Sequence, residues 1–525
     1  MPTNVFASNG SSVNVIAKNL RKDLEVLMTS ADLDNPDERL LERSAAELGT
    51  RVGAKAMRVL LEEACRRATM VDLAERGLTA DEVRWRREPE YFTTVRTTLG
   101  EVRVWTWAYR HRNAAGGWTT RVPARGKVVA QRRTRSSTVA LEWECKAGAM
   151  HPYRQGAELL PLFSHGKLTV EDNTMARHVV AIGLSIKRSW KYRTPADIAE
   201  VLATRATRDA KTGRPLMYFS CDAHTIRQYV NDTWAAQWKN INGVRLWCQD
   251  RKTGGIIHLG GDFTVGDCEE VVRLVEELGA LGILPTDLTY RCAAGEGGEA
   301  RRVTALLVVV TDGAKWLYGR LAQALPDAVW LLDAYHAFEY LGEYTATLYG
   351  KGTRATKEHY ATLITTLTGQ APSNRRPRCH ARSWRRKRPN KRRPVDYHQL
   401  IAAGFGIDTL IDYLEGYTVD AQHTGMHQAF VEKLRGLRAR MDYLGARARG
   451  MQIGSGAMES LHRTGSQLRL KLPGARWRPE VAQALLNLRC LGLAGRWDEF
   501  WSHDDLPQLL NSALGEHQSR VRRAA

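Results

Sequence analysis

The sequence predicts a mixed α/β fold, with helical segments before and after a sheet. An apolar meander occupies residues 216–264, and two continuous apolar runs follow at 303–314 and 328–336 with a helix between them. Apolar residues at helical spacing dominate most of the remaining chain. A meander followed by a β-α-β unit indicates one sheet with an antiparallel part and a parallel part.

Size and charge narrow the class of function. The chain has 525 residues, enough for about three to five domains. Its 77 Lys and Arg outnumber 57 Asp and Glu, which leaves a net charge of +20 and favours nucleic acid as the partner. The longest apolar stretch, Ala305–Val310, is far shorter than the roughly 20 residues that span a bilayer. We expect no membrane contact, no secretion signal and a cytoplasmic protein.

The cysteines argue against two further classes. Eight cysteines lie far apart in the chain, and no two of them form a C-x-x-C pair. A disulfide framework and a zinc ribbon are therefore not expected, and a reducing compartment is.

The first part of the chain divides into two predicted segments. Residues 1–88 form a helical N-terminal arm, since apolar residues recur at helical spacing over 36–80. Residues 89–135 form a β-hairpin region. Its centre, 91–110, is rich in β-branched and aromatic residues and is broken once at a Leu-Gly pair, which is typical of a hairpin.

Residues 136–212 predict a helix-turn-helix DNA-binding domain. Two apolar helical patterns, 156–163 and 168–183, are separated by a short turn that contains glycine. Thr174 and Arg177 lie near the start of the second helix, where base-reading side chains are found in such motifs. An ordinary helical hairpin explains the same pattern.

Aspartates at strand ends mark the first part of a catalytic core, 213–336. Asp222 ends the first strand of the meander, and Asp312 ends the most apolar strand. Asp333 ends the last strand, three residues before His336. Ligands gather at the carboxyl ends of strands in open α/β sheets, so these acids are candidates for one site. His336 has a structural interpretation as well, because a histidine at a strand end often packs.

A mostly helical insertion is predicted at 337–450, and it contains a basic loop at 375–394. The loop has 11 Lys and Arg between Arg375 and Arg393 and no acid. Such runs contact phosphates or are simply solvated. The candidate DNA contacts at its centre are Arg385, Arg386, Lys387 and Arg388.

The C-terminal helices of the core are predicted at 451–502, followed by a tail at 503–525. The apolar stripe of the first of these helices is Met458, Leu461, Gly465, Leu468 and Leu472. Glu459 and Arg463 lie on the adjacent face, where they form a site rim or a plain surface ion pair. Gly454 and Gly456 allow a close backbone approach, and Ser455 can cap the helix. Further candidates for DNA contact are Arg469 and Trp477, the latter by stacking on an unpaired base.

Three carboxylates in a strongly basic chain suit a metal-dependent nucleic-acid enzyme. Mg²⁺ is held by a few carboxylates, and substrate phosphate completes its coordination. Two such ions about 3.5–4 Å apart stabilise both the attacking and the leaving oxygen of a phosphoryl transfer.

The order Asp222, Asp312, Glu459 resembles that of the DDE transposases with an RNase H-like core. Asp333-Ala-Tyr-His336 resembles the D-x-x-H motif of members with an insertion before the glutamate. Four blocks resemble the C-terminal half of the Kra-type bacterial insertion-sequence transposases: IGSGAMES, GARW, ALLNLR and GRWDEFW. The resemblance covers roughly residues 90–510. One departure is the stretch 109–117, which lacks the cysteine ribbon that such families often carry there.

The resemblance implies an RNase H-like mixed sheet with a helical insertion, preceded by the β-hairpin and the helix-turn-helix. Asp222, Asp312 and Glu459 would hold Mg²⁺, with Mn²⁺ as a substitute, and His336 would assist. The implied activity is cleavage at element ends followed by strand transfer. The implied partners are double-stranded DNA, as terminal inverted repeats and target, and further copies of the chain in a homodimer or larger assembly. The expected location is the bacterial cytoplasm, at the nucleoid.

Two alternatives stay open at this point. One is a nuclease with the same core and no strand transfer. The other is a DNA-binding regulator, or a domesticated relative, that uses the helix-turn-helix and the basic surface without catalysis.

Overall fold

The structure is a computed structural model that forms two compact units. One unit comprises residues 1–187, 480–489 and 495–525, and the other comprises 188–479 and 490–494. Among the described residues, no helix is both long and apolar enough to cross a membrane. The residues that the structure describes are 17–18, 21–22, 24–26, 38–86, 88–124, 136–229, 235–266, 269–292, 301–313, 315–370, 395–506 and 508–515.

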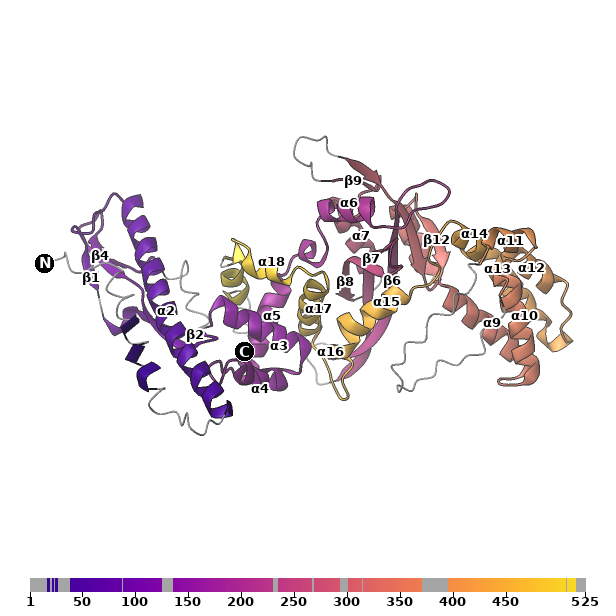
Figure 1. The fold of residues 1–525 in the computed structure, drawn as a ribbon. Coiled ribbons are helices and arrows are strands. Elements are labelled where there is room, and N and C mark those ends of the chain that lie inside the picture. The colour runs from indigo at the N-terminus through magenta and orange to yellow at the C-terminus, as the bar shows by residue number, and fades with distance from the viewer. Residues whose placement is uncertain are drawn as a thin grey trace. The chain divides into compact units, whose positions relative to one another are not determined.

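The first unit begins with a long helix and two small antiparallel sheets (Figure 1). One sheet has the order β1-β4-β5, and the other pairs β2 with β3. Val95, Val102, Val104 and Trp107 of the strand region form a buried cluster with Cys65 of the helix, which fastens the β2–β3 pair to it. The elements are α2 (Glu38–Glu75), β1 (Arg84–Arg86), β2 (Phe92–Thr97), β3 (Gly100–Trp105), β4 (Ala108–Arg112) and β5 (Trp118–Arg121).

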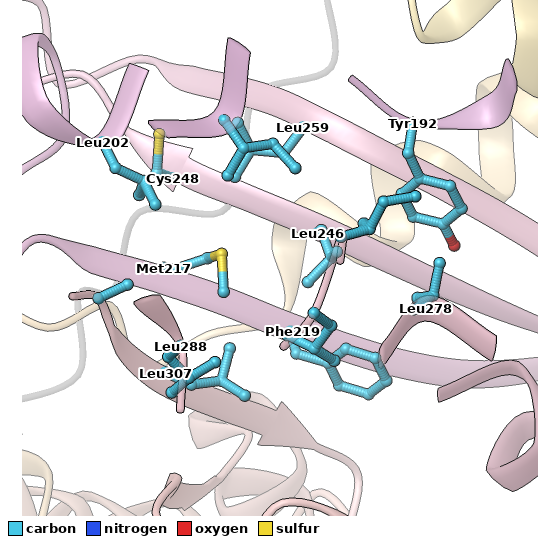
Figure 2. Close-up of a cluster of buried hydrophobic side chains, with 14 of the residues drawn as sticks. Tyr192, Leu202, Met217, Phe219, Leu246, Cys248, Leu259, Leu278, Leu288 and Leu307 are labelled. Carbon is cyan, nitrogen blue, oxygen red and sulfur yellow. The ribbon is translucent and has the colours of Figure 1, made fainter. Parts of the chain in front are cut away.

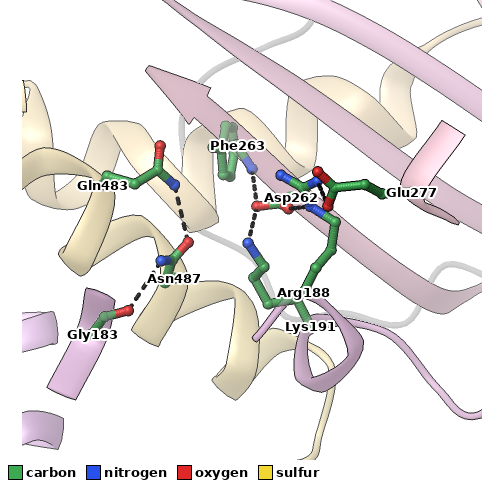
Figure 3. Close-up of polar contacts among 8 residues, drawn as sticks. All are labelled: Gly183, Arg188, Lys191, Asp262, Phe263, Glu277, Gln483 and Asn487. Atoms are coloured by element: carbon green, nitrogen blue, oxygen red, sulfur yellow. Dashed lines mark hydrogen bonds and ion pairs between the residues drawn. The ribbon is translucent and has the colours of Figure 1, made fainter. Parts of the chain in front are cut away.

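A helical cluster completes this unit. It contains α3 (Thr138–Met150), α4 (Tyr153–Phe163), α5 (Asp172–Ser185), α18 (Trp497–Ser502) and residues 480–489 of α17 (Pro479–Leu493). A Cβ added to Gly183 would lie 2.5 Å from the carbonyl oxygen of Ala484, so α5 and α17 touch through their backbones. The side chain of Asn487 donates to the Gly183 carbonyl at 3.0 Å (Figure 3).

The second unit is built on a five-stranded mixed sheet with the order β12-β11-β6-β7-β8. Strands β6, β7 and β8 are antiparallel, whereas β11 runs parallel to β6 and β12 runs parallel to β11. The expected meander and the parallel part therefore meet in one sheet, consistent with an RNase H-like core. The strands are β6 (Leu216–Tyr229), β7 (Ala236–Gln249), β8 (Ile256–Val265), β11 (Leu306–Thr311) and β12 (Val329–Leu332).

Both faces of this sheet are buried, which explains the continuous apolar runs. Met217 and Phe219 point into one cluster with Leu307 of β11 (Figure 2). Tyr218 and Val308 point into a second cluster on the other face. A strand covered on both faces needs apolar residues at every position. The elements that contribute to the first cluster include α6 (Pro195–Thr204), α7 (Glu269–Ala280), α8 (Lys315–Ala324), β9 (Thr289–Arg291) and β10 (Arg302–Thr304).

The expected end of the first strand at Asp222 is wrong. β6 continues to Tyr229 and pairs with β7 as far as Ala236. From residue 222 onward, intermediate or exposed positions interrupt the continuous burial of 216–221. The apolar run therefore ends where the covered part of the sheet ends, and the strand continues beyond it.

Asp262 is occupied by structural ion pairs. It lies in β8, and its carboxylate contacts Lys191 Nζ at 2.5 Å and Arg188 Nε at 2.9 Å (Figure 3). The 3-10 turn Arg188–Lys191 supplies both cations. These contacts tie the turn to the sheet.

The predicted insertion is helical where the structure describes it. Its helices share one apolar core that includes Leu341, Leu363, Leu410 and Leu434. Residues 371–394, which include the whole predicted basic loop and the four cations at its centre, lie outside the described residues. The helices are α9 (Ala334–Tyr349), α10 (Arg354–Thr368), α11 (Tyr397–Ala402), α12 (Ile407–Glu415), α13 (Thr424–Leu437) and α14 (Tyr443–Ala448).

The helix after residue 455 changes its winding. It consists of α15 (Gly456–Leu461), a π-helical segment (His462–Gln467) and α16 (Leu468–Leu470). The predicted stripe fails at Leu468, which is 58% exposed, while Leu470 is buried in its place. A π turn adds a residue to the helical repeat and rotates the following residues, which regular spacing cannot anticipate.

Candidate active site

Asp222 and Asp312 lie level with each other on neighbouring parallel strands. Ser220 of β6 is paired with Val310 of β11, and each aspartate follows two residues later in its strand direction. Leu332 of β12 is paired with Thr311, so Asp333 lies at the same level one strand further on. Parallel pairing thus places three aspartates in a row across the sheet. Gly313, with φ of +86°, turns the chain immediately after Asp312.

The row of acids affects the protonation of Asp222. Burial raises the pKa of Asp222, and the negative charges of Asp312 and Asp333 raise it further. The backbone N–H of Ala223 and the nearby His336 act in the opposite direction. A carboxylate whose charge is disfavoured by burial and by like charges gains when a cation arrives. The electrostatics therefore fit a positively charged ligand beside Asp222.

Asp333 has a structural role in addition. It is only 2% exposed and caps α9, with Oδ1 accepting from the N–H of Tyr335 at 2.7 Å. Oδ2 accepts from the N–H of Ser455 at 2.9 Å and also from its hydroxyl. Ser455 was expected to cap its own helix, but its side chain makes no capping bond there. Its hydroxyl instead ties the start of α15 to the end of β12.

His336 lies on the first turn of α9 and is close enough to Asp222 to influence its pKa. Its Nδ1 contacts Glu339 at 3.1 Å, and its side chain is 39% exposed. The ring is therefore accessible to a ligand near the aspartates.

Glu459 is exposed on α15, which is held against the sheet by glycines of the strands. A Cβ added to Gly243 would lie 2.4 Å from Met458 Cε, and one added to Gly261 would lie 2.9 Å from Leu461 Cδ2. Gly243 is paired with Asp222, so α15 crosses β7 beside that aspartate. The expected close approach at Gly454 and Gly456 is wrong, because no atom comes closer than 3.5 Å to a Cβ built there.

Two histidines missed in the sequence lie next to Asp222. His224 follows it by two residues, so strand alternation places both side chains on one face. His224 Nδ1 lies 2.5 Å from His462 Nδ1, and His224 Nε2 lies 2.8 Å from Ser466 Oγ. His462 Nε2 is 3.6 Å from Asp222 Oδ2. A polar chain thus links the π-helical segment to the first aspartate.

The position of the proton on each histidine follows from the Asp222 end of this series of contacts. Burial lowers the pKa of His224 to about 3 and that of His462 to about 4, so both rings are neutral at pH 7. One Nδ1 must donate and the other must accept. If His224 donates, His462 carries its proton on Nε2 and directs that N–H toward the Asp222 carboxylate. The opposite arrangement would direct a lone pair at the carboxylate, which is unfavourable.

Trp477 and Arg469, expected to contact DNA, are buried instead. Trp477 is 8% exposed and Arg469 is 2% exposed, with the guanidinium 4.9 Å from the centre of the indole ring. The indole N–H donates to the Leu470 carbonyl at 2.9 Å. The backbone beside Trp477 bonds to Arg227 and Tyr229, which adds this segment to the outer half of β6. The geometry favours packing for both side chains.

The remaining DNA-contact candidates within the described residues lie at accessible positions. Arg463 is exposed on the π-helical segment. Arg177 is exposed on α5, where it bonds to Thr174 Oγ1 at 2.9 Å, and Thr174 is half-buried.

The carboxylates do not form a complete metal cage. Across the part of the chain that the structure describes, no three His, Cys, Asp or Glu side chains are grouped closely enough to hold an ion. Strand pairing places Asp222 and Asp312 at the same level on neighbouring strands. Glu459 lies on α15, which crosses the sheet beside Asp222, and it does not complete a group of three ligands with them. Two carboxylates are nevertheless a common protein contribution to Mg²⁺, since water and phosphate supply the other ligands.

Comparison with known proteins adds little to this geometry. No protein-family model matches the sequence, and no curated protein matches it. Four chains of solved structures match. One of them, described as "Drosophila P element transposase strand transfer complex", is 11% identical with a TM-score of 0.17, and the match covers 69% of this chain and 88% of that one.

Proposed function

We propose that this protein is a DDE transposase, which cleaves DNA at element ends and joins the ends to target DNA. The observation that supports this most directly is the level alignment of Asp222 and Asp312 on parallel strands. Together with the raised pKa of Asp222, it describes a site suited to a cation in a strongly basic chain. The proposed partners are double-stranded DNA, as terminal inverted repeats and target, and further copies of the chain. The proposed setting is the bacterial nucleoid.

Asp222 and Asp312 would hold the divalent cation, Mg²⁺ or in its place Mn²⁺, and Glu459 would join them when DNA is bound. Such ions stabilise the charge on the attacking and leaving oxygens of a phosphodiester. His462 would orient the Asp222 carboxylate, and Asp333 would hold α15 so that Glu459 stays near the sheet. His336 would contact a phosphate beside the aspartates.

The proposed reaction has two steps. In the first, water attacks phosphorus, the bond from phosphorus to the 3′ oxygen breaks, and the products are a 3′-hydroxyl and a 5′-phosphate. In the second, that hydroxyl attacks a phosphodiester of target DNA and displaces its 3′ oxygen. Arg463, Thr174, Arg177 and the loop cations Arg385, Arg386, Lys387 and Arg388 are the proposed DNA contacts. Arg469 and Trp477 are left out of this set because they are buried.

The test uses labelled duplexes made from the DNA that flanks the gene, incubated with the full chain and Mg²⁺. We expect Asp222→Asn, Asp312→Asn and Glu459→Gln each to abolish cleavage and to leave DNA binding nearly unchanged. Asp250→Asn is the control and should still cleave, with rates compared at equal folded fraction because this variant loses an ion pair. Asp250 also follows a strand of this sheet, but that strand runs antiparallel to β6, so it lies at the opposite edge and is paired with Arg205.

The outcomes separate the alternatives. Cleavage without joined products would indicate a nuclease. Binding without cleavage by the wild-type chain would indicate a regulator. Full activity in one acid variant would remove that residue from the proposed site.

A further inference from the structure

The β1-β4-β5 sheet has two faces of opposite chemistry. On one face, the hydroxyl of Tyr109 donates to Asp72 of α2 at 2.5 Å. Arg121, paired with Tyr109 across the strands, contacts the same carboxylate at 3.0 and 3.1 Å. Tyr109 is fully buried and Asp72 is nearly so. This face is fastened to the long helix, where Asp72 also pairs with Arg76 at 3.3 Å.

The other face carries three arginines around one tryptophan. Cross-strand pairing places Arg84 opposite Arg110 and places Arg112 opposite Trp118. The guanidinium carbons of Arg84, Arg110 and Arg112 lie 4.5, 5.8 and 5.8 Å from the centre of the Trp118 ring. The indole is 36% exposed, and Arg84 and Arg112 are exposed. We call this surface the arginine face.

No described acid forms an ion pair with Arg84, Arg110 or Arg112. The ion pair at the margin of the face joins Arg86 to Glu88 at 2.8 Å. Arg110 Nε is buried without a hydrogen-bond partner among the described residues. Like charges directly opposite each other in a sheet are destabilising. The attraction of a cation to the Trp118 ring offsets part of this repulsion, but here three cations share one ring.

Three exposed arginines elsewhere in the described chain each have an acidic partner. Arg354, Arg435 and Arg438 are each paired with a carboxylate, at distances of 2.7 Å to Glu358, 2.6 Å to Glu415 and 2.5 Å to Asp408. The arginine face differs from these three positions, because it places three cations together without a described acid among them. An external anion would relieve the repulsion.

We infer that the arginine face binds the phosphate backbone of duplex DNA. Three guanidiniums on the two neighbouring strands β1 and β4 suit a row of phosphates, because each guanidinium can form two parallel hydrogen bonds to phosphate oxygens. The Trp118 ring is itself packed against guanidiniums, so it orients them. Phosphate contacts of this kind fix the position of the protein on DNA without reading its sequence. The inference adds a DNA contact to the proposed function and needs no catalysis by the aspartates.

The test compares two triple variants that lose the same charge. One carries Arg84→Gln, Arg110→Gln and Arg112→Gln, and the control carries Arg354→Gln, Arg435→Gln and Arg438→Gln. Binding of the full chain to a random-sequence duplex is followed by fluorescence anisotropy over a salt series. We expect the slope of log K against log salt to fall by about 0.9 for each lost phosphate contact, up to about 2.7 for the face variant. The slope of the control variant should change by less than about 0.9, the value for one lost phosphate contact. Equal slopes for the two variants would overturn the inference.

Two further measurements keep the result interpretable. The face variant should melt at or above the wild-type temperature, because it removes opposed like charges. If it does not fold, the single changes Arg84→Gln and Arg112→Gln carry the same test. A face variant that binds DNA normally but loses binding to polyglutamate would assign the surface to an acidic protein and overturn the inference. Asp222→Asn should retain the wild-type salt slope, so loss of cleavage and loss of this surface can be told apart.

Discussion

The carboxylate of Asp333 accepts a hydrogen bond from the backbone N–H of Ser455 at 2.9 Å, across 122 residues of chain. The insertion lies between these two residues in sequence. The bond fixes the start of α15 to the end of β12, and Glu459 lies four residues beyond Ser455. A short structural link thus joins the two halves of the proposed site.

We expect Ser455→Ala to lower the free energy of unfolding by about 1.5–3 kcal/mol, the range for a hydrogen bond to a charged group. Urea denaturation measures this change. Cleavage should slow more than the loss of folded protein explains, because α15 keeps only the backbone N–H part of its link to Asp333. Ser455→Thr keeps the hydroxyl and is the control. Unchanged stability and rate in the alanine variant would show that the hydroxyl part of the link is dispensable.

We expect His336→Ala to bind DNA normally and to slow cleavage or strand transfer at least about tenfold, which corresponds to roughly 1.4 kcal/mol in the barrier. The structural cost should be small, because a partly exposed pair with Glu339 contributes about 0–1 kcal/mol. Single-turnover cleavage and a thermal melt on the same preparation are the measurements. Glu339→Gln removes the pair but keeps the ring, so an equal loss in both variants would contradict a direct role for His336.

We expect His462→Phe to raise the Mg²⁺ concentration needed for half-maximal cleavage about 10- to 100-fold. This is the usual effect of removing a group that orients a metal ligand. His462→Gln keeps a donor near the Nε2 position and should lose less. Nitrogen-15 spectra of histidine-labelled protein should show the proton of His462 on Nε2. A proton on Nδ1 would contradict the direction of the chain from His224 to Asp222, whatever the activity.

We expect Asp250→Asn to destabilise the protein at neutral pH and progressively less in acid. Hydrogen bonds from Arg205, and then from the N–H groups of Lys252 and Thr253, lower the pKa of Asp250 from 3.8 to about 2. A lowered pKa means that the contribution is present above pH 3.8 and is lost as the pH falls toward 2. Melting temperatures between pH 2 and pH 7 test this. A constant difference between variant and wild type across that range would contradict it, and Arg205→Gln should reproduce the same pH dependence.

We expect Gly243→Ala to destabilise the protein by about 1–3 kcal/mol, the usual cost of adding a methyl group where the packing leaves no space. The new methyl would meet Met458 at 2.4 Å and Phe263 at 2.8 Å. Gly456→Ala is the control, since nothing lies within 4 Å of its added Cβ. The control should be neutral or slightly stabilising, because alanine favours a helix over glycine. Equal melting temperatures for the two variants would show that α15 does not depend on the close approach at Gly243.

The sequence by itself determined the mixed sheet and the placement of Asp312 and Asp333 at strand ends, but not that of Asp222, which lies inside β6. The two continuous apolar runs at 303–314 and 328–336, with a helix between them, predicted buried parallel strands, and β11 and β12 do pair in parallel. Gly313 after Asp312 marked a sharp turn at a strand end, and φ there is +86°.

Only the tertiary structure decided what surrounds those aspartates. Strand pairing brought Asp222 level with Asp312 across 90 residues of chain, and side-chain packing brought His462 to Asp222 across 240. The π-helical segment turned Arg469 inward and Leu468 outward, against the regular helical repeat. The arginine face likewise depends on strand register, which sets Arg84 beside Arg110. Spacing along the chain records local periodicity alone, whereas these contacts depend on which surfaces the folded sheet and helices bring together.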